Sequence, residues 1–464
     1  MSNIVEQAQA AADRQNWPLL VECLQQVTAK GSQQPEKHIL EQAVSLAIQA
    51  LESGDFQDRW EIAKVLPNLG NGAIAPLIAV LEDEDADTEP RWFAARILGK
   101  FVKPSYPVGN RPEVMLALVK LIENSDEELS QIAAETLANF GTTAIESLAT
   151  LLQQEDSRQF ATAALAQIRR PEIIAPLLSV VKDSQVAVRV AAIEALSSFH
   201  DSRIPPILVG ALTDVATAVR KEAVRALGVR AYLDAELDLV KLLKPLLWDI
   251  RLEVCQEAAI AIGRLNTDAG AAALFELLRS PTTPVQLQIE TVRALGWIET
   301  PAVLAYLQIA LIGRSAINAK FGELTNTNQL LTTDENLQKY HIESAVCQEI
   351  VTVLGRVEKP ELKAKAAEIA IDLLKSNHPA VESVEIKQSL ALALGQLGDM
   401  RALDVLIQLL ADADNSVKLH SLSALKQLDA GEVRQKLAGL VKQESLEPGL
   451  KQGIAIALQE WQEN

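Results

Sequence analysis

Histidines and cysteines are the side chains of this chain best suited to metal binding or nucleophilic catalysis, and they are few. The sequence has five histidines and three cysteines among 464 residues. No two histidines fall within one helical turn, and the His-Glu-x-x-His spacing that binds zinc does not occur. The histidines are His38, His200, His341, His378 and His420. The sequence therefore predicts no metal site.

Cys255 and Cys347 each lie in the tetrapeptide Val-Cys-Gln-Glu. Packed helices lie about 9–10 Å apart, so we expect these cysteines to be too distant for a shared zinc ion or a disulfide. Burial at a helix interface explains both residues, and a ligand for iron–sulfur assembly is the alternative. Gly-rich nucleotide loops and Gly-x-Ser-x-Gly are absent, which argues against a nucleotide site or a nucleophile triad.

Aromatic residues make up only 4% of the chain, so each exposed one is a candidate contact for a partner. Arg59-Trp60 and Arg91-Trp92 recur at the same place in two successive segments. Tryptophan beside arginine can form a stacking or cation–π platform, and packing in the core is the alternative. We predict partner contacts at Arg59, Trp60, Arg91, Trp92, Tyr106, Arg111, Trp248, Arg293, Trp297, Arg314, Phe321 and Tyr340.

These candidates belong to a repeated helical pattern. Eleven segments read as an amphipathic helix ending in Ala/Val-x-x-Leu-Gly or a close variant, for example Val219-Arg-Lys-Glu-Ala-Val-Arg-Ala-Leu-Gly228. The Leu or Ile before the glycine is the anchor of each segment: Leu66, Leu98, Leu137, Leu165, Leu196, Leu227, Ile262, Leu295, Leu354, Leu394 and Leu425. A period near 31 residues is typical of stacked helical repeats. We therefore predict an all-α, right-handed α-solenoid of about eleven or twelve helical pairs.

A second, more hydrophobic helix follows each of these signature helices, as in Ile74-Ala-Pro-Leu-Ile-Ala-Val-Leu81. Proline is tolerated in its first turn, where no N–H donor is needed. The glycines at the signature either cap the helix in a left-handed conformation or allow close approach of a neighbouring helix. Both interpretations stay open for Gly70, Gly99, Gly228, Gly263, Gly296, Gly355 and Gly395.

An aspartate precedes several signature helices, with a basic residue six positions later: Asp85/Arg91, Asp183/Arg189, Asp214/Arg220 and Asp412/Lys418. The aspartate can cap a helix, and the basic side chain can bridge to it or to the next turn. This pattern resembles the HEAT repeat, specifically the short repeats of the phycobilisome-lyase (E/F-type) family. The resemblance covers about residues 55–464.

The resemblance implies a ladder of such pairs along the stack, with the second helices on the concave side and a cyanobacterial source. We expect the ladder to be interrupted at Cys255, Gln288 and Cys347, which replace the basic residue.

Two segments break the rhythm of the repeats. One is Pro-rich, residues 101–112, and the other lies where two anchors are 59 residues apart. A long loop in a regular solenoid is usually functional or disordered, and a degenerate extra repeat is a third interpretation. We predict an N-terminal helical cap at 1–54 with helices near 3–29 and 36–52. HEAT-like repeats at 55–315, an insert at 316–341, and repeats with a C-terminal cap at 342–464 follow.

The formal net charge of −18 argues against nucleic acid and anionic membrane surfaces as partners, because both attract clustered Lys and Arg. The acidic run 82–87 is the best place for a basic partner, and a solvated acidic surface is the simpler interpretation. No apolar run approaches the roughly 18 residues of a membrane helix. With no secretory signal pattern and few cysteines, we expect a soluble, cytoplasmic protein without membrane insertion.

A solenoid surface can bind another protein without catalytic residues. We expect a protein–protein interaction scaffold or assembly factor, non-enzymatic and without cofactor, that binds a protein partner on its concave face. The resemblance implies an alternative, a phycobilin lyase or chaperone-like factor that binds a linear tetrapyrrole and acts on a phycobiliprotein subunit. Arg91, Trp92, Tyr106 and Arg111 would then form part of one groove, and Arg293, Trp297 and Arg314 part of another. An iron–sulfur assembly partner is the second alternative.

Overall fold

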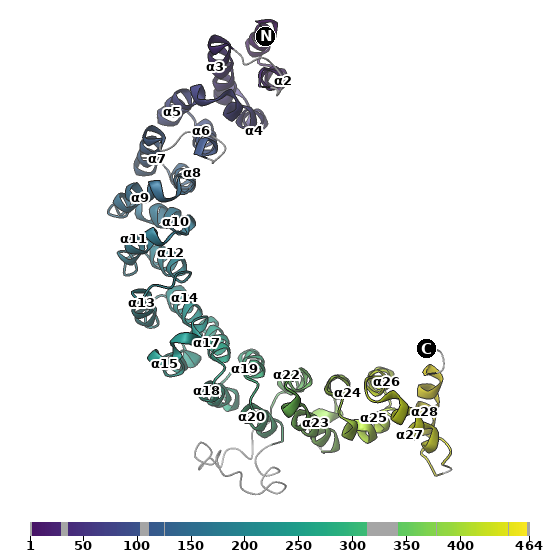
Figure 1. Cartoon of the computed structure of the whole chain (residues 1–464). Helices are drawn as coiled ribbons and strands as arrows, with labels where there is room; N and C mark the ends of the chain where they lie inside the picture. The colour runs from purple at the N-terminus through teal and green to yellow at the C-terminus, as the bar shows by residue number, and fades with distance from the viewer. Residues whose placement is uncertain are drawn as a thin grey trace. The chain divides into compact units, whose positions relative to one another are not determined.

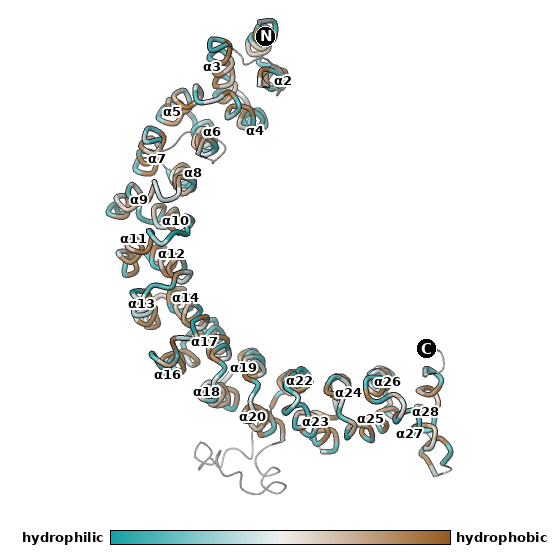
Figure 2. Tube along the Cα trace, viewed as in Figure 1, coloured by the Kyte–Doolittle hydropathy of each residue, from teal (hydrophilic) through white to brown (hydrophobic). Residues whose placement is uncertain are grey.

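The computed structural model describes residues 2–28, 36–102, 111–124, 126–312, 342–376, 378–443 and 445–461. In these residues every regular element is a helix and none is a strand (Figure 1). Apolar and polar residues alternate around the helices (Figure 2), as expected for helices that each bury one face. The predicted all-α solenoid is confirmed, and the predicted insert at 316–341 lies outside the described residues.

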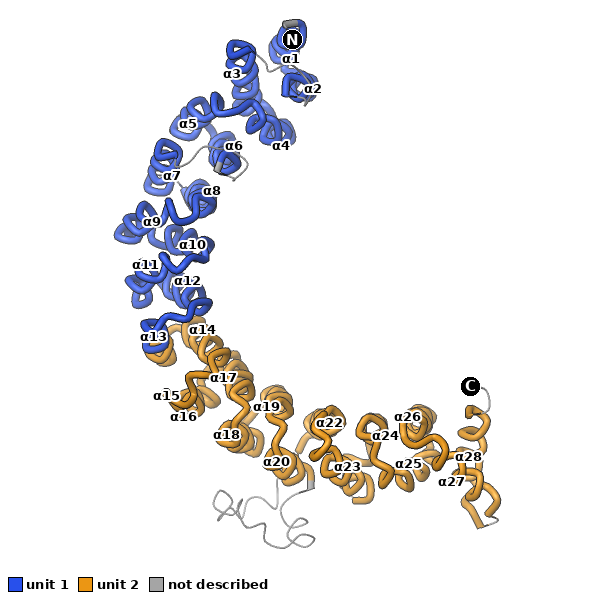
Figure 3. Tube along the Cα trace, in the orientation of Figure 1, with its two compact units in different colours: residues 1–207 blue, residues 208–464 orange. Residues whose placement is uncertain are grey.

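The chain divides into two compact units, residues 1–207 and 208–464 (Figure 3). The helices of the first unit are α1 (Ser2–Asp13), α2 (Trp17–Val27), α3 (Lys37–Ser53), α4 (Phe56–Val65), α5 (Ile74–Glu82), α6 (Thr88–Leu98), α7 (Pro112–Asn124), α8 (Glu127–Ala138), α9 (Ile145–Leu151), α10 (Arg158–Ile168), α11 (Ile174–Leu178) and α12 (Val186–Leu196). The boundary falls within α13 (Ile204–Ala211).

The helices of the second unit are α14 (Thr217–Gly228), α15 (Asp234–Leu237), α16 (Leu239–Leu243), α17 (Leu252–Leu265), α18 (Asp268–Arg279), α19 (Val285–Trp297), α20 (Pro301–Ile312), α22 (Ser344–Gly355), α23 (Pro360–Lys375), α24 (Val384–Leu397), α25 (Leu403–Leu409), α26 (Asn415–Gln427), α27 (Ala430–Leu440) and α28 (Pro448–Glu460). Short 3-10 turns join several of them, including η7 (Lys244–Trp248). The eleven predicted anchors are all buried, with at most 1% of their surface exposed. The repeat pattern therefore identified the core correctly.

The long helix predicted at 3–29 is divided into α1 and α2. Gln15 adopts a left-handed conformation with φ of 54°, which ends α1. Asn16 then caps α2, its side chain accepting a hydrogen bond from Leu19 N at 3.2 Å, and Pro18 occupies the first turn. Local capping chemistry divides the segment, although its hydrophobic pattern is continuous.

The helices form two rows in each unit, and the row on the inner side is not the one expected. In each unit taken by itself, the signature helices form the row on the inner side of the bend: α4, α6, α8, α10 and α12 in the first, and α14, α17, α19, α22, α24 and α26 in the second (Figure 3). The second helices lie on the outer side. The expectation that they line the concave side was therefore wrong.

Close contacts between signature helices explain this arrangement in the second unit. A Cβ atom placed on Gly228 would lie 2.5 Å from the Cβ of Ala261 on α17. A Cβ on Gly355 would lie 2.8 Å from the Cα of Ala393 on α24. The same close approach recurs at Gly263, Gly296 and Gly395. Because small residues let these helices approach closely, their row is the shorter one and lies inside the bend. Close approach, not a left-handed cap, explains these five glycines.

The predicted ladder is present at Arg220, which reaches the next turn as expected, and at Arg158 and Lys387, which were not among the basic residues predicted for it. Arg220 uses its Nε and Nη2 atoms to donate to both carboxylate oxygens of Asp249, in the next turn, at 2.8 Å. Toward its own turn, Arg220 donates to the carbonyl oxygen of Asp214, also at 2.8 Å. Further pairs between neighbouring repeats are Arg158–Asp183 and Lys387–Asp412, both at 2.6 Å. Each pair therefore ties one repeat to the next.

The ladder loses its charge where cysteine or glutamine replaces the basic residue, but two contacts to the backbone remain. Cys255 Sγ donates to the carbonyl oxygen of Asp249 at 3.1 Å, and Gln288 Nε2 donates to the carbonyl oxygen of Leu278 at 3.2 Å. These carbonyls lie at helix or turn ends that lack an intrahelical donor. Capping of the preceding element is thus the more general role of this position.

Replacing Gly228 with alanine should destabilise the protein, although alanine favours helix by about 1 kcal/mol. The new methyl group would meet Ala261, and overpacking costs about 1–3 kcal/mol. Gly210→Ala is the matched control, because nothing lies within 4 Å of a Cβ there, and it should be neutral or stabilising. Thermal unfolding followed by circular dichroism measures both; a stabilised Gly228→Ala variant would contradict the packing argument.

Arg220→Ala should lower the free energy of unfolding by about 3 kcal/mol, because it leaves the buried Asp249 carboxylate without its partner. Hydrogen bonds from Arg220 lower the pKa of Asp249. The stabilisation is therefore complete above the ordinary aspartate pKa of about 3.9 and is lost as pH falls through the lowered value. As pH falls, the free energy of unfolding of Arg220→Ala should therefore decrease less than that of the wild-type chain.

Arg225→Ala is the control for this measurement, because Arg225 pairs with Glu222 on the same helix and its side chain is 47% exposed. Exposed pairs contribute about 0–1 kcal/mol. Urea unfolding at several pH values measures the free energy of unfolding of both variants. If Arg220→Ala and Arg225→Ala lower it equally, the ladder has no special role in stability.

Candidate protein-binding surface

The first turns of α4 place two aromatic side chains on the inner row of the first unit. Asp55 caps α4 by accepting a hydrogen bond from Asp58 N at 2.9 Å, and the Asp58 carboxylate accepts one from Asp55 N at 3.1 Å. Phe56 and Trp60 lie one helical turn apart and stack, with ring centroids 6.2 Å apart and an interplanar angle of 19°. Phe56 remains 55% exposed. The cap therefore fixes the start of a stacked aromatic pair in which Phe56 is exposed and Trp60 is half-buried.

Helix α6 packs against α4 and adds a second pair of aromatics. Phe93 is fully buried and makes edge-on contacts with Phe56, Trp60 and Trp92 at centroid distances of 5.5, 6.4 and 5.1 Å. The guanidinium carbon of Arg96 lies 5.1 Å from the Trp60 ring centroid and 5.2 Å from that of Trp92. Both distances suit a cation–π interaction. We call Phe56, Trp60, Trp92 and Arg96 the aromatic surface.

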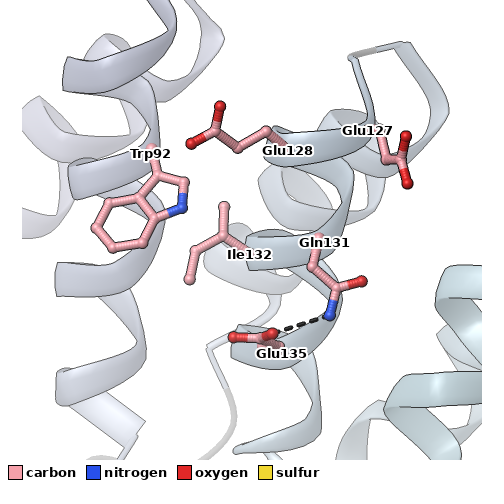
Figure 4. Close-up of a pocket in the computed structure, with 6 residues that line it drawn as sticks. All are labelled: Trp92, Glu127, Glu128, Gln131, Ile132 and Glu135. Carbon is pink, nitrogen blue, oxygen red and sulfur yellow. Dashed lines mark hydrogen bonds between the residues drawn. The ribbon is translucent and has the colours of Figure 1, made fainter.

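A hollow of about 560 Å³ lies between Trp92 and α8, and we call it the α8 hollow. It is lined by Trp92, Glu127, Glu128, Gln131, Ile132 and Glu135. Figure 4 shows the Trp92 ring on one side, with Glu128 and Ile132 opposite it. Gln131 Nε2 donates to Glu135 Oε1 at 2.8 Å. The hollow joins an apolar wall to a set of carboxylates.

The carboxylates of the α8 hollow are held by local helix chemistry. Asp126 caps α8 by accepting a hydrogen bond from Leu129 N at 3.0 Å. Glu127 and Glu128 occupy the first turn, where the helix dipole favours negative charge. Within the described part of the chain, no Lys, Arg or His forms an ion pair with Glu127, Glu128 or Glu135. Among the described residues, their charge is therefore not compensated by an ion pair.

Three of the predicted arginines use their side chains within the fold. Arg59 is buried, donates to the carbonyl oxygens of Leu51 and Glu52, and pairs with Glu89. Arg91 Nε donates to the carbonyl oxygen of Leu81 at 3.0 Å. Arg111, also buried, donates to Asn71 Oδ1 at 2.8 Å. Of the residues predicted in the first unit, Trp60 and Trp92 are thus the pair that the structure brings together on one surface.

In the second unit, Trp248 lies on a different element from Arg293 and Trp297, which are one helical turn apart on α19 (Val285–Trp297). Trp248 ends η7 and is 46% exposed, and Trp297 ends α19 and is 50% exposed. Arg293 donates to both carboxylate oxygens of Glu349 at 3.1 Å and pairs with Glu290 at 2.7 Å. Tyr106, Arg314, Phe321 and Tyr340 lie outside the described residues, so their predicted contacts stay predictions.

The cysteines are buried and carry neutral thiols. Burial raises the pKa of Cys347 to about 11, and burial also raises the pKa of Cys255. They lie on α22 and α17, with α19 packed between these helices. No group of three or more His, Cys, Asp or Glu suited to a metal ion occurs in the described residues. Across the same residues, no helix has the length and apolar character needed to cross a membrane.

Several residues of the surface were missed at the sequence level. Phe56 and Arg96 lie four residues from Trp60 and Trp92, so helical spacing alone could have found them. Glu127, Glu128 and Glu135 line the hollow only because α8 packs beside α6. The order of the anchors could have predicted this neighbour, because α8 carries the next anchor after α6.

Comparison with known proteins now identifies the repeats. HEAT repeats match residues 74–159 and 154–228, and a PBS lyase HEAT-like repeat matches residues 386–412. No curated protein sequence matches the chain.

Two solved structures show the same fold class. Importin beta, crystallised in an ammonium sulfate condition, is 15% identical with a TM-score of 0.52, and the alignment covers 97% of this chain and 63% of importin beta. Kap95p, in a structure on its binding to RanGDP, is 14% identical with a TM-score of 0.52, covering 98% of this chain and 63% of Kap95p. This chain thus spans about two thirds of their length. The chain therefore contains HEAT repeats at residues 74–228 and 386–412, and the solved structures share its α-solenoid fold.

Proposed function

We propose that this chain is a protein-interaction scaffold that holds a partner against the inner row of its first unit. The aromatic surface carries the proposal. Aromatic residues make up 4% of the chain, yet α4 and α6 gather Phe56, Trp60 and Trp92 on one face, beside an open hollow. Trp60 and Trp92 are half-buried, and tryptophan and arginine are enriched among the residues that contribute most to protein–protein binding.

The fold supports this proposal in a general way. Solenoids present extended surfaces to partners, and Kap95p, which shares this fold class, binds RanGDP in its structure. Buried free cysteines suit a reducing compartment, so we place the protein in the cytoplasm.

A bilin lyase is the second proposal, and the PBS lyase HEAT-like repeat at 386–412 is the observation that favours it. A linear tetrapyrrole carries propionate groups, which need cations beside them. The α8 hollow is lined by carboxylates, which repel propionates. A bilin would therefore bind elsewhere on the chain, and the absorption spectrum of protein isolated from its native host tests for it.

Trp60→Ala with Trp92→Ala should weaken binding of the native partner by at least about 30-fold, because buried interface tryptophans often contribute about 2 kcal/mol or more each. The partner is first isolated with the wild-type chain, and its affinity is then measured by calorimetry. Leu116→Ala is the control, since Leu116 is 58% exposed on α7 of the outer row.

Helical circular dichroism must be the same in all three proteins for the comparison to hold. Unchanged affinity in the double variant would refute the proposed surface. A coloured, bilin-containing complex whose formation does not depend on Trp60 and Trp92 would favour the lyase proposal instead.

A further inference from the structure

The α8 hollow has walls of two kinds, and together they define the ligand. Trp92 and the buried Ile132 form an apolar side, and Glu127, Glu128 and Glu135 supply the acidic lining. Figure 4 shows the Glu128 carboxylate reaching toward the Trp92 ring, with Glu135 below it and Glu127 directed away from the ring. A ligand that satisfies both walls needs an apolar stem and a cationic end. Lysine and arginine side chains have this structure.

The aromatic surface already contains the kind of contact that we expect with the ligand, a guanidinium packed against a tryptophan ring. Arg96 lies 5.2 Å from the centroid of the Trp92 ring. The ring therefore accepts a guanidinium on the side of α4, while the α8 hollow opens beside the same residue. A second cation in the hollow would contact the indole and reach the glutamates. An anion would meet three carboxylates there.

A second acidic segment extends this surface toward the neighbouring repeat. The turn between α5 and α6 carries exposed Asp83, Glu84, Asp85 and Asp87. This turn directly precedes the signature helix α6, and Glu127 and Glu128 begin α8, the signature helix of the next repeat. Among the described residues of the run 82–87, Glu82 has a basic partner, Lys120, at 3.0 Å. Several cations of one extended segment can thus meet acidic groups of two repeats.

We infer that the α8 hollow receives a lysine or arginine side chain from a basic segment of the protein partner. The inference rests on the proposed scaffold function and adds the chemistry of the partner. Charge complementarity favours this occupant, because the chain has a net charge of −18 and the carboxylates of the hollow form no ion pair among the described residues.

The test uses a fluorescein-labelled synthetic peptide of alternating lysine and leucine, and its match with glutamate in place of lysine. Binding to the full chain is measured by fluorescence anisotropy at low and high salt. The hollow variant is Glu127→Gln, Glu128→Gln and Glu135→Gln. The control variant, Glu146→Gln, Glu155→Gln and Glu172→Gln, removes the same charge from exposed positions outside the hollow.

The hollow variant should bind the lysine peptide about tenfold more weakly than wild type, as expected for three partly exposed ion pairs. The control should change affinity less than about twofold, and the difference should shrink in high salt because exposed charges are screened. Unfolding curves establish that both variants are folded.

Two results would overturn the inference: equal weakening in both variants, which shows non-specific attraction, or no selective binding of the lysine peptide by wild type. Either result leaves the proposed function standing if the Trp60 and Trp92 double variant still releases the native partner. If the double variant instead retains the native partner, the proposed function itself is wrong.

Discussion

The close approach of consecutive signature helices is the constraint on which the rest of the structure depends. At Gly228 and Gly355 no side-chain atom fits between one helix and the next. Larger side chains are excluded from this contact, which explains why alanine recurs in the signature. The positions of these helices that face solvent along the inner row take no part in this contact or in the buried core, and they are free to vary. Binding residues can therefore change without altering the stack.

The ladder adds directionality to this packing. The side chain that follows each turn caps carbonyl groups of the element before it, and charged versions such as Arg220 also pair with the next repeat. Cys255 and Gln288 keep the contact to the backbone without the charge. Neighbouring repeats are thus joined by hydrogen bonds at their edges as well as by apolar contact, which is the basis of stability in repeat proteins.

Sequence reasoning predicted the solenoid and its core well, because anchors such as Leu227 recur at a period that few other folds produce. It assigned the rows to the wrong sides, since curvature depends on small differences in helix spacing that the hydrophobic pattern does not contain. It selected Arg59 and Arg91 as binding residues, whereas both bond to backbone carbonyls. Trp60 and Trp92 were found from their type and from their recurrence beside an arginine at the same place in two successive repeats. The α8 hollow required the neighbouring helix.

We propose that the partner is recognised on the inner row of the first unit, where the aromatic surface and the α8 hollow lie side by side on α4, α6 and α8. Amide hydrogen exchange of the full chain, alone and with its native partner, tests this claim most directly. The account predicts slower exchange in α4, α6 and α8 when the partner is bound, with α5, α7 and α9 unchanged. Protection confined to the outer helices, or to the second unit, would contradict it.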